Sequence, residues 1–109
     1  MQDVPDKWVV VKIQQEKKDD MFKLFTSWSG GYLSEDRWRM NSGIVRVEED
    51  DMFMTFYGNS GSEYVCRKGS YGTTFFSEEV INGFIERLKE IGVLMTIMPE
   101  DFEFFNKIT

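Results

Sequence analysis

The chain has 109 residues, a formal net charge of −6, 16% aromatic residues, one cysteine and no histidine. Its length corresponds to a single domain, 1–109, and its aromatic content excludes a disordered chain. No apolar run approaches the roughly 20 residues of a membrane span, and the first residues lack a secretion signal. The lone Cys66 excludes an internal disulfide and favours the cytoplasm, while the missing histidine argues against an enzyme.

The first two predicted strands precede most of the glycines. Residues 8–14 are rich in β-branched side chains and predict a strand, and residues 21–28 predict another. In the second strand Phe22, Leu24, Thr26 and Trp28 share one face. Lys23 lies on the other face, which is mixed in character and should be only partly solvated.

From Phe22 to Lys68, short aromatic runs alternate with turns of polar residues and glycine. This pattern predicts an antiparallel meander, with further strands at 37–40, 44–47, 52–57 and 63–68. The turns are read from three similar tripeptides: Ser29-Gly30-Gly31, Asn41-Ser42-Gly43 and Asn59-Ser60-Gly61. Glycine at such points supplies the positive φ that a tight reversal needs.

A helix over residues 77–91 is the clearest element after the meander. Ser77 is the predicted N-cap, Gly92 the predicted residue after the C-cap, and the apolar stripe comprises Val80, Ile81, Phe84, Ile85, Leu88 and Ile91. A single stripe places this helix on one face of the sheet, and residues 93–98 predict a last strand ended by Pro99. The fold class is therefore α+β, an antiparallel meander with one helix packed on one face.

The tail, residues 100–109, is acidic and aromatic. Its phenylalanines, Phe102, Phe104 and Phe105, either pack back on the domain or are offered to another chain. Both alternatives are open at the level of sequence.

The sequence contains no strong catalytic, metal-binding or phosphate-binding motif. Glu48-Glu49-Asp50-Asp51 lacks the spacing of a calcium loop and is interpreted as a solvated hairpin tip, so no metal site is predicted. Cys66 lies in a predicted strand without a histidine to activate it, and is interpreted as a small buried hydrophobe. The glycine tripeptides fit no phosphate-binding motif, and no carboxylate pair stands out by spacing, so neither a cofactor nor a catalytic residue is predicted.

Basic and aromatic residues of the meander suggest an interaction surface. Trp38 and Met40 should face the helix, while Arg37 and Arg39 should face outward. The predicted surface comprises Lys23, Tyr32, Arg37, Arg39, Arg46 and Arg67. A protein partner or self-association is preferred because exposed arginines and aromatics favour protein interfaces. The alternative is a single-stranded nucleic-acid binder, which the net negative charge disfavours.

Three runs of the sequence resemble short uncharacterised accessory proteins of T-even-like tailed phages of the cyanophage type. They are Val4-Pro5-Asp6-Lys7-Trp8-Val9-Val10, Trp38-Arg39-Met40-Asn41-Ser42-Gly43-Ile44 and Asn59-Ser60-Gly61-Ser62-Glu63-Tyr64-Val65-Cys66. The resemblance extends to Pro99 and carries no known activity. It implies expression in the cytoplasm of an infected bacterium and a non-enzymatic role in binding a host or viral protein.

Overall fold

The computed structural model of the chain describes residues 2–29 and 36–108. The predicted α+β class is confirmed. The helical elements are α1 (Phe75–Glu90), α2 (Phe102–Phe105) and a 3₁₀ turn, η1 (Lys68–Ser70). The strands are β1 (Gln2–Asp3), β2 (Lys7–Gln14), β3 (Met21–Trp28), β4 (Arg37–Met40), β5 (Ile44–Glu49), β6 (Phe53–Gly58), β7 (Glu63–Arg67) and β8 (Leu94–Ile97).

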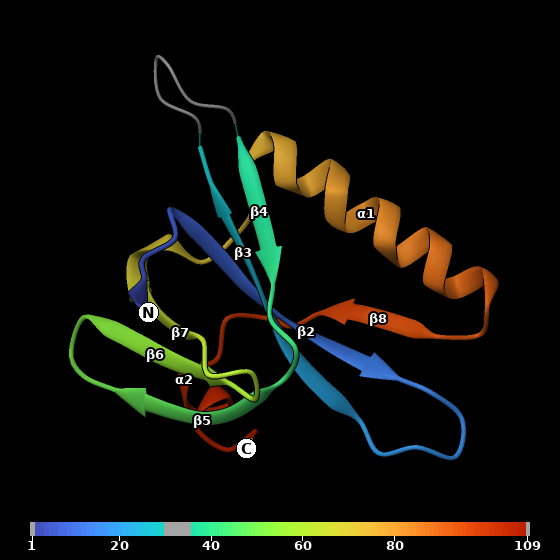
Figure 1. Ribbon diagram of the computed structural model, residues 1–109, viewed down its shortest axis with the longest axis horizontal. Helices are drawn as coiled ribbons and strands as arrows, with labels where there is room; N and C mark the ends of the chain where they lie inside the picture. Colours follow the sequence, from blue (N-terminus) through green and yellow to red (C-terminus); the bar gives the residue numbers. More distant parts are fainter. Residues whose placement is uncertain (1, 30–35, 109) are drawn as a thin grey trace.

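The strands are divided between two sheets, which differs from the single predicted meander. Sheet A has the order β1-β7-β6-β5, and sheet B has the order β4-β3-β2-β8. All neighbouring strands pair antiparallel except β1 and β7, which run parallel. In Figure 1 sheet A lies at the lower left, sheet B crosses the centre, and α1 lies at the upper right.

Asn41 is the point at which the chain leaves sheet B for sheet A. Its backbone N–H donates to the Leu24 carbonyl at 3.0 Å, as in a strand. The Leu24 N–H instead donates to the Asn41 side-chain Oδ1 at 2.8 Å. The amide oxygen thus replaces the backbone carbonyl of the departing chain, and Asn41-Ser42-Gly43 is a crossing between sheets and not a hairpin turn.

The main core lies between the two sheets. Trp8 is fully buried and packs against Phe56 and Tyr71 at ring centroid distances of 5.4 and 4.8 Å. Its indole N–H donates to the Arg67 carbonyl at 2.7 Å, so the one polar group of this buried ring has a hydrogen-bond partner. Other buried members of this cluster are Val10, Leu24, Ile44, Met54, Tyr64, Cys66 and Phe105. Sheet A therefore covers most of the sheet B face that was expected to be open.

Helix α1 covers the other face of sheet B and forms a second core with Val9, Val11, Phe25 and Met95. Trp38 faces this helix, as predicted, and lies 5.6 Å from the Phe25 ring and 5.2 Å from the Phe84 ring. The predicted stripe is correct except at Ile91, which is the C-cap and is 73% exposed.

The ends of α1 follow capping chemistry. The N-cap is Thr74, not the predicted Ser77, because Thr74 and Ser77 exchange backbone–side-chain hydrogen bonds in a capping box. At the other end Gly92 has φ +80, and the N–H groups of Gly92 and Val93 donate to Lys89 and Leu88. These two hydrogen bonds form a Schellman motif, which confirms Gly92 as the residue after the C-cap.

Replacing Thr74 with alanine should lower the free energy of unfolding by about 1 kcal/mol, because the N–H of Ser77 then loses its acceptor. Chemical denaturation checks the loss. Thr73→Ala is the matched control, since Thr73 is not the cap, and an equal loss in both variants would contradict the assignment.

Tyr71 joins β2 to the chain that follows β8. Its hydroxyl accepts from the Val10 N–H at 3.1 Å and donates to the Met98 carbonyl at 2.6 Å. Desolvation by burial raises the pKa of Tyr71 to about 12, although the Val10 hydrogen bond acts in the opposite direction.

Stability should therefore fall as the pH rises from about 10 to about 12, since the unfolded tyrosine ionises first and the folded one holds its proton. The contribution of Tyr71 is complete below the unfolded pKa and is lost as the pH passes the folded one. Denaturation of the wild-type protein and of Tyr71→Phe at several pH values measures this. The variant should show a shallower decline, and parallel declines would refute the linkage.

Candidate functional site

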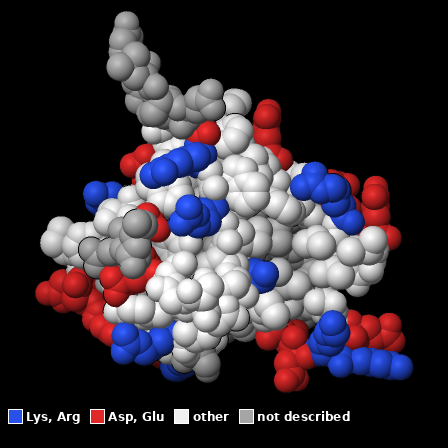
Figure 2. Space-filling view, viewed as in Figure 1, with Lys and Arg blue, Asp and Glu red and all other residues white. Residues whose placement is uncertain are grey.

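The predicted basic surface does not form one patch. Lys23 lies opposite Val11 and shares the α1 side of sheet B. Arg37 and Arg39 lie on the other side of that sheet, opposite Trp28 and Thr26. Arg46 and Arg67 lie on the outer face of sheet A, and Tyr32 falls outside the described residues. Figure 2 shows basic and acidic side chains interspersed over the surface.

Intrachain contacts occupy three of these arginines. Arg37 and Arg39 face away from α1, as predicted. The Arg37 guanidinium lies 4.4 Å from the Trp28 ring centroid. Arg39 pairs with Asp3 of sheet A at 3.5 Å, and Arg46 pairs with Glu48 at 2.9 Å. Such exposed pairs contribute little stability, but they show that these cations already have neighbours.

The outer face of sheet A is the exposed sheet face. One row at the end of this face holds Arg46, Tyr57 and Glu63 in register. Arg46 stacks 4.1 Å from the Tyr57 ring centroid, while desolvation and a hydrogen bond with Glu63 raise the pKa of Tyr57. Because Arg46 and Arg67 are matched by Glu48 and Glu63, this face has no net charge to attract phosphate.

Only half of the acidic block lies in the hairpin tip: Asp50 and Asp51 are in the turn as predicted, whereas Glu48 and Glu49 belong to β5 and pair with Thr55 and Met54. The Asp50 carboxylate accepts from the N–H groups of Met52 and Phe53, both at 2.8 Å, and these bonds lower the pKa of Asp50. Hydrogen bonds from Lys68 and Asn106 lower the pKa of Glu49. Among the residues that the structure describes, no group of three metal-ligating side chains converges.

Cys66 is buried in the inter-sheet core, which confirms its interpretation as a small hydrophobe. Desolvation raises the pKa of the Cys66 thiol well above its ordinary value. A buried thiol with little thiolate is a poor nucleophile at neutral pH.

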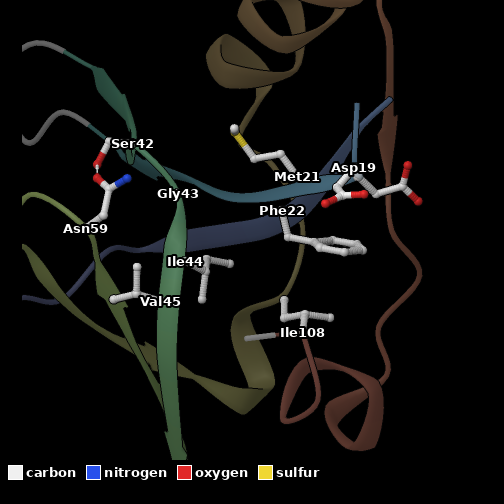
Figure 3. Close-up of a pocket in the computed structure, with 10 residues that line it drawn as sticks. Asp19, Met21, Phe22, Ser42, Gly43, Ile44, Val45, Asn59 and Ile108 are labelled. Atoms are coloured by element: carbon white, nitrogen blue, oxygen red, sulfur yellow. Dashed lines mark hydrogen bonds between the residues drawn. The ribbon is translucent and has the colours of Figure 1, made fainter. Parts of the chain in front are cut away.

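A pocket lies where two of the glycine tripeptides meet. The Asn59 N–H donates to the Gly43 carbonyl at 3.1 Å, and the Ser42 hydroxyl donates to the Asn59 side-chain oxygen. Gly43 has φ +145, a backbone conformation that favours glycine. These contacts hold the sheet crossing against the β6–β7 loop and form one wall of the pocket (Figure 3).

The pocket, which we call the inter-sheet pocket, has a volume of about 300 Å³. Its lining residues are Asp19, Asp20, Met21, Phe22, Ser42, Gly43, Ile44, Val45, Asn59 and Ile108. Phe22, Ile44 and Ile108 come from β3, β5 and the C-terminal segment (Figure 3). All charged lining residues are acidic. Asp20 lies 3.7 Å from Lys12, whereas Asp19 makes no ion pair with any described residue.

Sequence reasoning missed this pocket because its lining comes from four separated segments. None of the residues of the predicted interaction surface lines it. The sequence does carry a local signal, because two Asn-Ser-Gly tripeptides lie in the predicted turns. Their contact with each other depends on the packing of the two sheets and is not encoded by their spacing.

Comparison with protein-family models, curated proteins and solved structures finds no match for this chain. In the described part of the chain, no helix has both the length and the apolar character needed to cross a membrane.

Proposed function

We propose that the protein is a non-enzymatic interaction module that binds a protein partner through the inter-sheet pocket. One observation carries the proposal: a hollow open to solvent combines five apolar side chains with polar groups, and its only charged lining residues in the described part of the chain are acidic. Val45 in its wall is 52% exposed, and Met21 is also exposed. Apolar anchors in pockets supply much of the binding energy at protein interfaces.

The rim defines the chemistry of the partner. Asp19 and Asp20 favour lysine or arginine beside an apolar anchor, and the net charge of −6 extends the same preference over long range. The volume lies near the lower end of ligand pockets and suits an anchoring side chain better than a large cofactor. The resemblance to phage accessory proteins supports a host or viral protein as the binding partner. Binding would then take place in the cytoplasm of an infected bacterium.

Single-stranded nucleic acid is the weaker candidate. The predicted cations lie on three different faces, and the rim acids would repel phosphates. Retention of labelled single strands that falls steeply with salt would favour this alternative over the proposal.

A displayed peptide library selected on the folded protein tests the proposal. Enriched peptides should combine Lys or Arg with a neighbouring Leu, Ile, Met or Phe. Asp19→Lys should weaken their binding by about tenfold. Asp51→Lys is the matched control, because it makes the same charge change outside the pocket.

Val45→Lys should weaken binding through the apolar wall, whereas Met52→Lys should not, although Met52 is also strongly exposed. Enrichment of acidic peptides would count against the proposal. Equal effects of the pocket and control variants would do so as well.

A further inference from the structure

Within residues 2–29 and 36–108 the two sheets have four open edges, and three of them carry features that discourage pairing with another strand. β1 has only two residues, β4 carries Arg37 and Arg39, and β5 combines a register shift near Ile44 with charged residues. Short strands, charges and bulges are the means by which natural sheets protect their edges.

The fourth edge, β8, is as short as β4 but carries neither a charge nor a bulge. Its sequence Leu-Met-Thr-Ile is uncharged and its register with β2 is regular. Leu94 is 52% exposed and Ile97 is 37% exposed. No described residue outside β2 forms a backbone hydrogen bond with residues 94–97.

The hydrogen-bond alternation shows which groups point outward. The Met98 N–H donates to the Val10 carbonyl at 2.8 Å, so this opposite pair is of the hydrogen-bonded kind. Hydrogen-bonded and non-hydrogen-bonded pairs alternate along antiparallel strands. Thr96 is therefore bonded to β2, while Met95 and Ile97 direct their N–H and C=O groups to the open edge.

We propose that β8 pairs antiparallel with β8 of a second copy of this chain, so that two copies of sheet B form one continuous sheet. In the register centred on Thr96, Thr96 lies opposite Thr96 of the partner and Met95 lies opposite Ile97. The outward groups of Met95 and Ile97 then form four hydrogen bonds across a two-fold axis. This surface is separate from the inter-sheet pocket.

A second copy is the proposed occupant because β8 is the edge whose self-pairing brings no like charges together and places Thr96 opposite its own copy. A two-fold axis places like residues near each other, so self-pairing of β4 would bring arginines together. Self-pairing of β5 would likewise bring Glu48 and Glu49 near their copies. The uncharged β8 has no such repulsion, and opposed threonines are favourable cross-strand pairs.

Sedimentation equilibrium of the full chain should show a reversible dimer of twice the 12.9 kDa monomer mass. Thr96→Lys and Thr96→Glu should each be monomeric, since like charges then face each other, and an equimolar mixture should recover the dimer. A wild-type protein that stays monomeric up to about 1 mM would overturn the proposal and leave the edge to another protein's strand. Unchanged dimerisation in both variants would also overturn it.

Cysteine cross-linking tests the register independently. Thr96 and its copy form a non-hydrogen-bonded pair with Cα atoms about 4.5 Å apart, within the range that a disulfide spans. Oxidised Thr96→Cys should therefore run as a covalent dimer on a non-reducing gel. Leu94→Cys is the control, because its two copies lie about 13 Å apart in this register, and Cys66 is buried. Equal cross-linking of both variants, or of neither, would refute the pairing.

Discussion

Replacing Phe105 with alanine is expected to lower the free energy of unfolding by about 3–5 kcal/mol. The side chain is fully buried between the sheets. Its ring centroid lies 5.6 Å from that of Tyr71 and 5.8 Å from that of Trp8. Alanine would remove these contacts and leave a cavity lined by large rings, which are poorly able to close around it.

The expected loss is a large share of the stability of a domain of this size, typically about 5–15 kcal/mol. Urea denaturation followed by tryptophan fluorescence measures it. Phe75→Ala is the matched control, because Phe75 is 91% exposed and should change stability by less than about 0.5 kcal/mol.

This result would also establish that the tail belongs to the folded domain. Between the two alternatives for the tail, the structure has its described residues, 100–108, packed back on the core through Phe102, Phe104, Phe105 and Ile108. The Asp101 carboxylate caps α2 by accepting from the Phe104 N–H at 3.1 Å. The Phe104 ring lies 5.5 Å from Phe22. A Phe105→Ala protein as stable as the wild type would contradict this placement.

Asn41→Ala is expected to cost about 1–3 kcal/mol, because the fully buried Leu24 N–H would lose its acceptor. Water cannot easily replace the amide oxygen there, since Asn41 is itself buried and lies against Gly58. The same denaturation experiment measures the loss.

Asn59→Ala provides a closely matched control. Asn59 begins the second Asn-Ser-Gly tripeptide, but its side-chain bond with Ser42 is exposed and its backbone bond to Gly43 survives in alanine, so its replacement should cost about 0.5 kcal/mol or less. If the two alanine variants lost equal stability, the special role of Asn41 at the sheet crossing would be wrong.

The local elements could be predicted well from the sequence. The strand predictions at 21–28 and 37–40 agree with β3 and β4 at both ends. In both strands the alternation of apolar and polar side chains stops where the strand ends, so the sequence marks the boundary. The helix differs by two residues at its start because Thr74 and Ser77 both carry hydroxyls suited to an N-cap. The choice between them depends on the backbone direction at Thr74.

The two-residue β1 and the four-residue α2 were not predicted. Gln2 and Asp3 become a strand only because β7 lies beside them. Phe102–Phe105 is too short to form a stable helix alone, so burial of Phe105 and the Asp101 cap decide its conformation. The candidate site has the same origin, since its walls meet only after the two sheets pack.

The sequence by itself determined the fold class, most strands, the helix and the side of β4 that faces it. These features follow from side-chain periodicity and capping within a few residues. Only the tertiary structure decided how the strands divide into sheets. Asn41-Ser42-Gly43 and Asn59-Ser60-Gly61 have the same local chemistry, yet the first crosses between sheets and the second joins neighbours within sheet A. The physical reason is the bond from the Leu24 N–H to Asn41, which forms only when β3 lies alongside.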